Sequence, residues 1–77
     1  MVIESKIREI VATQCLRPVS SATNGATIRA DLGADSLTLV LIGLELEAEY
    51  GRPVSNEDLD QMHTVEDVIT YVMSRAA

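Results

Sequence analysis

The chain has 77 residues, enough for one domain with a modest core, and its 47% content of apolar residues indicates a globular protein. It has no Phe or Trp and only two Tyr, so we expect an aliphatic core and no aromatic platform for single-stranded nucleic acid. The net charge is −6, which argues against nucleic acid as a partner and favours proteins with basic surface patches.

The first predicted element is a helix over residues 2–16. Apolar side chains recur there at the spacing of one helix face, namely Ile3, Ile7, Ile10 and Val11. Pro18 marks the end of the helix, because the residue before a proline is pushed out of the helical conformation. Residues 17–35 then form a long loop that Ile28 and Leu32 are expected to anchor to the core. Loops of this length in small domains are commonly functional.

Residues 36–50 form the second predicted helix, which Gly51 and Pro53 end. Its apolar residues fall on two arcs rather than one. The first arc is expected to face the core and contains Leu39, Ile42, Gly43, Leu46 and Tyr50. The second contains Leu37, Val40, Leu41, Leu44 and Ala48. Two apolar arcs exceed what two neighbouring helices can cover, so the second arc lies either under the long loop or exposed as an interaction site.

Two capping patterns follow. Ser55 begins a short helix that runs to about Met62, and Thr64 with Asp67 begins a last helix that ends near Arg75. We therefore predict an all-α four-helix bundle with three longer helices and one short one, forming a single domain over residues 1–77.

The most informative motif spans residues 31–37, Asp-Leu-Gly-Ala-Asp-Ser-Leu. It places Ser36 where a Gly-containing loop becomes a helix, directly after Asp35, a residue type that caps helix N-termini. The positive end of a helix also favours a phosphate group. The motif therefore predicts an exposed hydroxyl at a position suited to a phosphodiester.

This motif, in its Leu-Gly-Ala-Asp-Ser-Leu form, resembles the attachment site of the acyl carrier protein family. The acidic segment 51–60 and the helix start at 64–68 are similar to the same family. The resemblance implies a freestanding carrier whose Ser36 bears a covalent 4′-phosphopantetheine arm, with Asp35 and Leu37 beside it, and a bundle interior that shelters the acyl chain. The side chains that would line that interior are Leu39, Ile42, Leu46, Leu59, Met62 and Ile69.

The implied partners are a phosphopantetheinyl transferase and the enzymes that load and accept acyl groups. The expected docking residues are Val40, Leu41, Leu44, Glu45, Glu47, Glu49, Glu57 and Asp58. Family members usually have acids where Thr38 and Leu41 stand here. The docking face is therefore more apolar than usual, which suggests a specialised carrier whose partners have basic or apolar patches.

Two alternatives stay open: an aminoacyl carrier loaded by an ATP-dependent ligase, and an unmodified acidic docking module. An enzyme is not expected, because the lone histidine, His63, has no nucleophile motif with it. The turn that contains Asn56, Glu57, Asp58 and Asp60 lacks calcium-loop spacing, so no metal site is expected. The single cysteine, Cys15, excludes an internal disulfide and fits a reducing cytoplasm. With neither a signal peptide nor an apolar span expected, we predict a cytoplasmic monomer without membrane insertion.

Overall fold

The computed structural model describes residues 2–76, with side chains for residues 3–75. Met1 and Ala77, the ends of the predicted single domain, lie outside the described residues. The elements are α1 (Val2–Gln14), a 3₁₀ turn η1 (Val19–Ser21), α2 (Ser36–Tyr50), α3 (Asn56–Asp60) and α4 (Val65–Ala76). The predicted all-α bundle with one short helix is confirmed. Within residues 2–76, no helix has the length and apolar content needed to cross a membrane.

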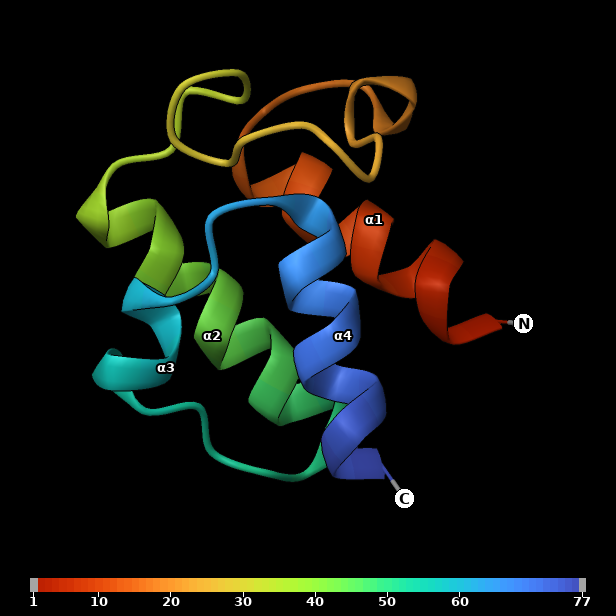
Figure 1. Ribbon diagram of the computed structural model, residues 1–77, viewed down its shortest axis with the longest axis vertical. Coiled ribbons are helices and arrows are strands. Elements are labelled where there is room, and N and C mark those ends of the chain that lie inside the picture. The colour runs from red at the N-terminus through yellow and green to blue at the C-terminus, as the bar shows by residue number, and fades with distance from the viewer. Residues whose placement is uncertain (1, 77) are drawn as a thin grey trace.

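The helices enclose one aliphatic core. α1 packs against α2 and α4, and α3 packs against α2, while the loop between α1 and α2 runs across one end of the bundle (Figure 1). The largest fully buried side chains come from every part of this arrangement except α3: Ile7, Val11, Ile28, Leu32, Ile42, Leu46, Val65 and Val68. The predicted anchoring of the loop by Ile28 and Leu32 is therefore confirmed.

The long loop is also tied to the start of α4 by its backbone. Thr27 and Thr64 form an antiparallel bridge, Ile28 N donates to the carbonyl of His63 at 2.9 Å, and Val65 N donates to the carbonyl of Ala26 at 3.1 Å. These bonds give the residues before Ser36 a defined position relative to α4. The end of the loop, where α2 begins, is therefore held in a defined place although the loop is long.

Both predicted caps are confirmed. Ser55 Oγ accepts a hydrogen bond from Asp58 N at 3.1 Å at the start of α3. At the start of α4, Thr64 Oγ1 accepts from Asp67 N at 3.1 Å while the Asp67 carboxylate accepts from Thr64 N at 3.1 Å, which is the reciprocal capping box. The short helix nevertheless ends at Asp60 rather than Met62, because the chain turns at Gln61 and Met62 is buried in the core.

The end of α1 differs from the prediction. The helix stops at Gln14, and Leu16 adopts a left-handed conformation with φ 57°. Arg17 N donates to the carbonyl of Ala12 and Leu16 N to that of Thr13, which is the hydrogen-bond pattern of a Schellman motif. This motif therefore ends the helix, and Pro18 instead precedes the 3₁₀ turn η1, an element that no sequence pattern had indicated.

Leu16 is the position where a substitution is expected to increase stability. Its side chain is 91% exposed, so it contributes little packing, while a left-handed conformation costs a residue with a side chain about 1–2 kcal/mol. Replacing Leu16 by Gly should raise the free energy of unfolding by about 0.5–1 kcal/mol, since the greater freedom of Gly in the unfolded chain offsets part of the gain. Urea denaturation measures this, with Leu16→Ala as the matched control that keeps the strain. Equal stability of the two variants would contradict the explanation.

Candidate functional site

Ser36 is the first residue of α2, and its side chain is exposed. The residue before it is the cap: Asp35 Oδ1 accepts hydrogen bonds from Thr38 N and from Thr38 Oγ1, both at 2.9 Å. The turn into the helix also depends on Gly33, which has φ 76°, a conformation that glycine adopts at no steric cost. The Ser36 hydroxyl thus stands in solvent at the positive end of a four-turn helix.

Asp35 and Asp67 are both held in the ionised state by capping. Hydrogen bonds from the backbone N–H and the hydroxyl of Thr38 lower the pKa of Asp35 below its usual value of 3.8. The pKa of Asp67 is lowered as well, chiefly by the backbone N–H of Thr64 and also by that of His63. Each carboxylate therefore accepts these hydrogen bonds more strongly when it is charged than when it is protonated.

A loss of stability in acid follows from these two shifts. A carboxylate with a lowered folded-state pKa stabilises the protein above the unfolded-state pKa, and this contribution disappears as the pH falls through the folded-state pKa. The free energy of unfolding should therefore decrease between about pH 5 and pH 3. Urea denaturation at the two pH values should show a smaller decrease for the double variant Asp35→Asn, Asp67→Asn. An undiminished decrease in that variant would contradict the assignment to these caps.

A depression of about 180 Å³ opens beside Ser36, between α2 and α3. Leu39, Val40 and Leu59 form its apolar part. Its polar part consists of Ser36 with Arg29, Asn56 and Asp60. Arg29 had no predicted role, and Asn56 and Asp60 were considered only as members of an acidic turn without a metal site. These three come from the loop and from α3, and no spacing pattern connects them to Ser36, so only the fold brings them together.

The two arcs of α2 separate as predicted. Leu39, Ile42, Gly43 and Leu46 are buried, whereas four residues of the second arc are exposed: Leu37 by 66%, Leu44 by 56%, Val40 by 42% and Leu41 by 39%. The open question about the second arc is thereby resolved, because the long loop does not cover it. An apolar strip therefore runs along α2 from the residue next to Ser36.

The acidic docking candidates are placed in two ways. Glu45, Glu47, Glu49 and Glu57 are exposed. Asp58 is only partly exposed, and its Oδ2 accepts hydrogen bonds from Tyr71 Oη at 2.8 Å and from Arg75 Nη2 at 3.0 Å. The four glutamates are therefore available to a partner, while the Asp58 carboxylate is already engaged within the chain.

The six residues predicted to line the interior are all buried: Leu39, Ile42, Leu46, Leu59, Met62 and Ile69. Leu39 and Leu59 also reach the depression beside Ser36. Gly43 lies against Leu59, since a Cβ at position 43 would stand 3.2 Å from Leu59 Cδ2. The glycine thus allows α2 and α3 to approach closely, which answers why it occurs within a helix.

Two further titratable residues, His63 and Cys15, do not line the depression beside Ser36. His63 is exposed, and Cys15 is half-buried with a thiol pKa raised by burial. Among residues 3–75, no three His, Cys, Asp or Glu side chains lie close enough together to hold a metal ion.

A comparison with known families gives this geometry its context. Residues 5–72 match the family model described as the phosphopantetheine attachment site. Proteins of this family attach 4′-phosphopantetheine covalently to a serine. They are not catalytic themselves; they interact with a phosphopantetheinyl transferase and carry the arm for biosynthetic enzymes. Because the match covers most of the chain, this protein belongs to the phosphopantetheine-attachment family of carrier proteins.

Proposed function

We propose that Ser36 is the serine that bears the arm, and that the protein carries acyl groups for fatty-acid, polyketide or related specialised biosynthesis. The observation that carries the proposal is the position of Ser36, exposed at the first residue of the capped helix α2. Of the other described serines, Ser5 and Ser74 lie within helices, Ser20 and Ser21 lie in the 3₁₀ turn, and Ser55 caps the five-residue α3. None of these begins a long helix.

The residues around Ser36 fit a phosphodiester. The N-terminus of α2 supplies a positive partial charge, and the arginine side chain of Arg29 lines the same depression. Arg29 is exposed. It forms no ion pair within 4 Å, because Arg75–Asp58 is the single such pair among residues 3–75. The positive charge of Arg29 is therefore available to a phosphate oxygen. When bound, the arm supplies a thiol that holds the cargo as a thioester.

Acyl cargo is favoured over aminoacyl cargo by the apolar walls beside the serine. Leu39 and Leu59 reach from the depression into the core, so an apolar chain could pass between α2 and α3 if the Leu59 side chain moves. An aminoacyl group is polar and would gain little from these walls. A long-chain acyl thioester on the protein should therefore raise its melting temperature, whereas an aminoacyl thioester should not.

The strip of Leu37, Val40, Leu41 and Leu44 is the proposed docking surface for partner enzymes. Its apolar residues are exposed by 39–66%, and Glu45, Glu47 and Glu49 lie on the same helix. An apolar patch with an acidic border suits partners whose own patches are apolar with basic borders. We expect the carrier to act as a monomer in the cytoplasm, where the free Cys15 would stay reduced.

The proposal is tested by incubating the protein with a phosphopantetheinyl transferase and coenzyme A and fragmenting the product in a mass spectrometer. The added mass should lie on the peptide that contains Ser36 and on no other serine. A mass gain elsewhere would refute the assignment of Ser36, and no gain with several transferases would favour an unmodified docking module.

A further inference from the structure

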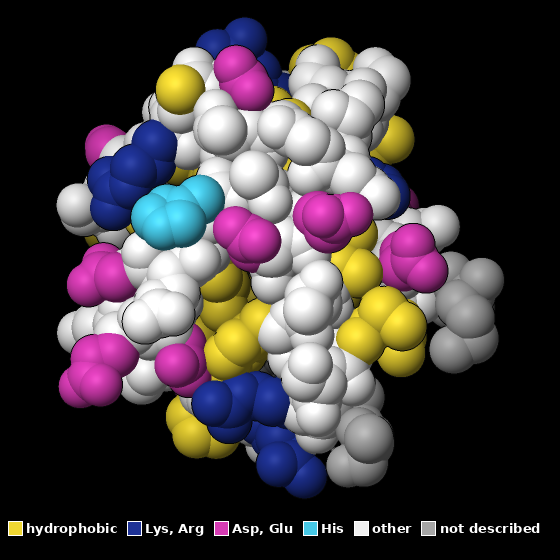
Figure 2. Space-filling view, viewed as in Figure 1, with side chains coloured by type: hydrophobic (Ala, Val, Ile, Leu, Met, Phe, Trp, Pro, Cys, Tyr) yellow, Lys and Arg dark blue, Asp and Glu magenta, His cyan; other side chains and the backbone are white. Residues whose placement is uncertain are grey.

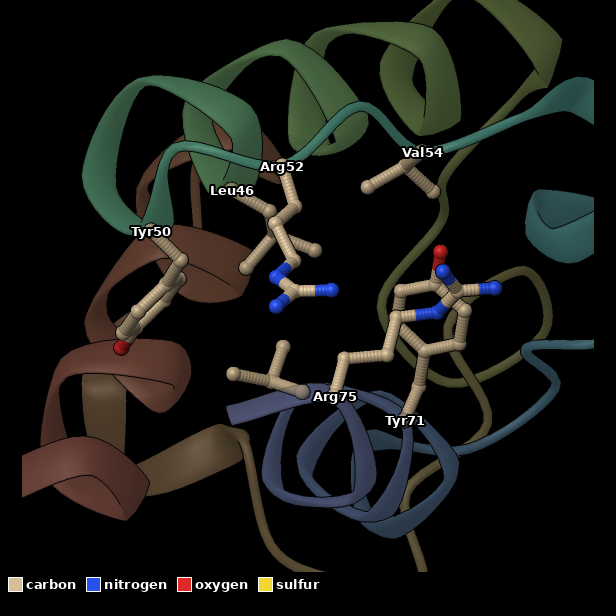
Figure 3. Close-up of a pocket in the computed structure, with 7 residues that line it drawn as sticks. Leu46, Tyr50, Arg52, Val54, Tyr71 and Arg75 are labelled. Atoms are coloured by element: carbon tan, nitrogen blue, oxygen red, sulfur yellow. The ribbon is translucent and has the colours of Figure 1, made fainter. Parts of the chain in front are cut away.

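A second pocket, of about 220 Å³, lies away from Ser36 where α2 and α4 end. Leu46, Val54 and Val72 form its apolar part, and the rings of Tyr50 and Tyr71 lie on either side (Figure 3). The Tyr50 hydroxyl points away from the pocket toward α1 (Figure 3), where it is buried without a hydrogen-bond partner among the described residues. The pocket is therefore apolar inside, and its polar character comes from its rim.

That rim carries two of the six cationic side chains of the protein. Arg52, in the turn after α2, extends its guanidinium group toward α4, and Arg75 projects from α4 beside the Tyr71 ring (Figure 3). Figure 2 shows basic side chains gathered at this end of the molecule, next to exposed apolar ones, while acidic side chains and a few further basic ones are scattered over the rest of this face. Two cations over an apolar pocket are unusual for a chain with a net charge of −6.

The two arginines are not equally neutralised. Arg75 Nη2 lies 3.0 Å from Asp58 Oδ2, and its guanidinium carbon lies 4.6 Å from the centre of the Tyr71 ring. Arg52 has no carboxylate within 4 Å among residues 3–75. The rim therefore holds one uncompensated positive charge and a second guanidinium group whose position is already set by Asp58 and Tyr71.

We propose that this pocket binds a carboxylate at the end of an apolar chain. One uncompensated charge matches a monoanion better than the dianion of a phosphate monoester, and guanidinium groups bind carboxylates through paired, charge-assisted hydrogen bonds. The volume of 220 Å³ lies below the ~300 Å³ at which pockets for drug-sized ligands begin. It therefore suits a short apolar chain, or the terminal segment of a longer one, rather than a drug-sized ligand.

Such a carboxylate has two sources: a free fatty acid, or the far end of a dicarboxylic acyl group carried by the protein. The second source rests on the proposed function. It agrees with the layout of α2, because Leu39 beside Ser36 and Leu46 in this pocket are seven residues apart on the buried face, or roughly 10 Å along the helix. A cargo that entered beside Ser36 and extended about this distance along the buried face of α2 would have its terminus near the two arginines.

The first experiment uses the unmodified protein and free ligands. Octanoate should bind and shift the side-chain Nε–H signals of Arg52 and Arg75 in NMR spectra, whereas 1-octanol should not shift them. Arg52→Gln should weaken octanoate binding about tenfold, as expected for loss of a charge-assisted hydrogen bond, and Arg52→Lys should restore part of it. Lys6→Gln, which removes one positive charge from α1 instead, should change binding by less than about twofold.

The second experiment uses the protein loaded by a transferase with either an octanoyl or a suberoyl group, which differ in the terminal carboxylate. A suberoyl cargo should shift the Arg52 and Arg75 signals and raise the melting temperature of the protein, and Arg52→Gln should remove the difference from octanoyl. If suberoyl cargo shifts the Arg52 and Arg75 signals, the bound carboxylate comes from the cargo. If only free octanoate shifts them, the bound carboxylate comes from a free fatty acid.

Failure of this proposal is distinguishable from failure of the proposed function. If the transferase does not modify Ser36, the proposed function fails, and the experiment with free octanoate still decides about the pocket. If neither octanoate nor the suberoyl cargo shifts the two arginine signals, or if 1-octanol binds as tightly as octanoate, the pocket is a plain apolar gap and the inference is overturned.

Discussion

Replacing Ile42 by alanine is expected to lower the free energy of unfolding by about 2–5 kcal/mol. Ile42 is 1% exposed at the middle of α2 and belongs to the hydrophobic core, so the truncation leaves a cavity that the surrounding helices cannot fully close. The free energy of unfolding of protein domains is only about 5–15 kcal/mol, and a chain of 77 residues is expected to lie toward the lower end. The variant should consequently show a much lower urea midpoint and melting temperature by circular dichroism.

Leu44→Ala is the matched control on the other arc of the same helix. Leu44 is 56% exposed, so its truncation should change the free energy of unfolding by no more than about 0.5 kcal/mol. It should instead reduce the rate at which partner enzymes use the loaded carrier, if the strip of Leu37, Val40, Leu41 and Leu44 is the docking surface. Equal destabilisation by the two truncations would contradict the assignment of opposite roles to the two arcs.

The helices were predictable where local chemistry determines them. Residues 36–50 were predicted as a helix, and α2 spans Ser36–Tyr50, because Asp35 caps its start and Gly51 ends it in the left-handed conformation, with φ 75°. The two arcs were also predictable, since they follow from a repeat of about 3.6 residues per turn. What the sequence left open was whether the long loop covers the second arc, and the path of that loop across one end of the bundle (Figure 1) is a property of the whole fold.

Predictions were wrong where tertiary contacts or strain outweighed local preference. No local rule favours a leucine in the left-handed conformation, yet Leu16 ends α1 there, in a motif where glycine is usual. The predicted end of α3, at about Met62, lies two residues beyond the observed end at Asp60, because the chain turns at Gln61 and Met62 is buried as part of the connection to α4. In both cases the pattern of apolar residues continued past the end of the helix.

The residues of the two sites also differ in how far the sequence predicted them. The sequence motif pointed to Ser36 with its cap Asp35, because both are adjacent in the chain. Arg29 beside Ser36, and the pair Arg52 and Arg75 at the other pocket, were not predictable, since loops and helix ends that are distant in sequence bring them together. Residues that act through proximity in the fold leave no spacing pattern, whereas residues that act at one helix end do.

Ser36→Ala is expected to abolish the mass gain that a phosphopantetheinyl transferase and coenzyme A produce, while leaving the fold intact. The Ser36 side chain is exposed, and the hydrogen bonds that cap α2 are made by Asp35, so the hydroxyl makes little contribution to stability. Alanine is also a favourable residue within the first turn of a helix. Intact-protein mass spectrometry should show an unmodified variant whose circular dichroism spectrum and urea midpoint match those of the parent.

Ser55→Ala gives the opposite pattern and serves as the matched control. Ser55 Oγ caps α3 by accepting from Asp58 N at 3.1 Å, so its loss should cost about 0.5–2 kcal/mol while the transferase still modifies the protein fully. One serine is thus expected to matter for chemistry and the other for folding, although both stand at helix starts. If Ser36→Ala still gains the arm, or if it unfolds while Ser55→Ala does not, then the exposed hydroxyl at the start of α2 is not the free attachment point that its geometry indicates.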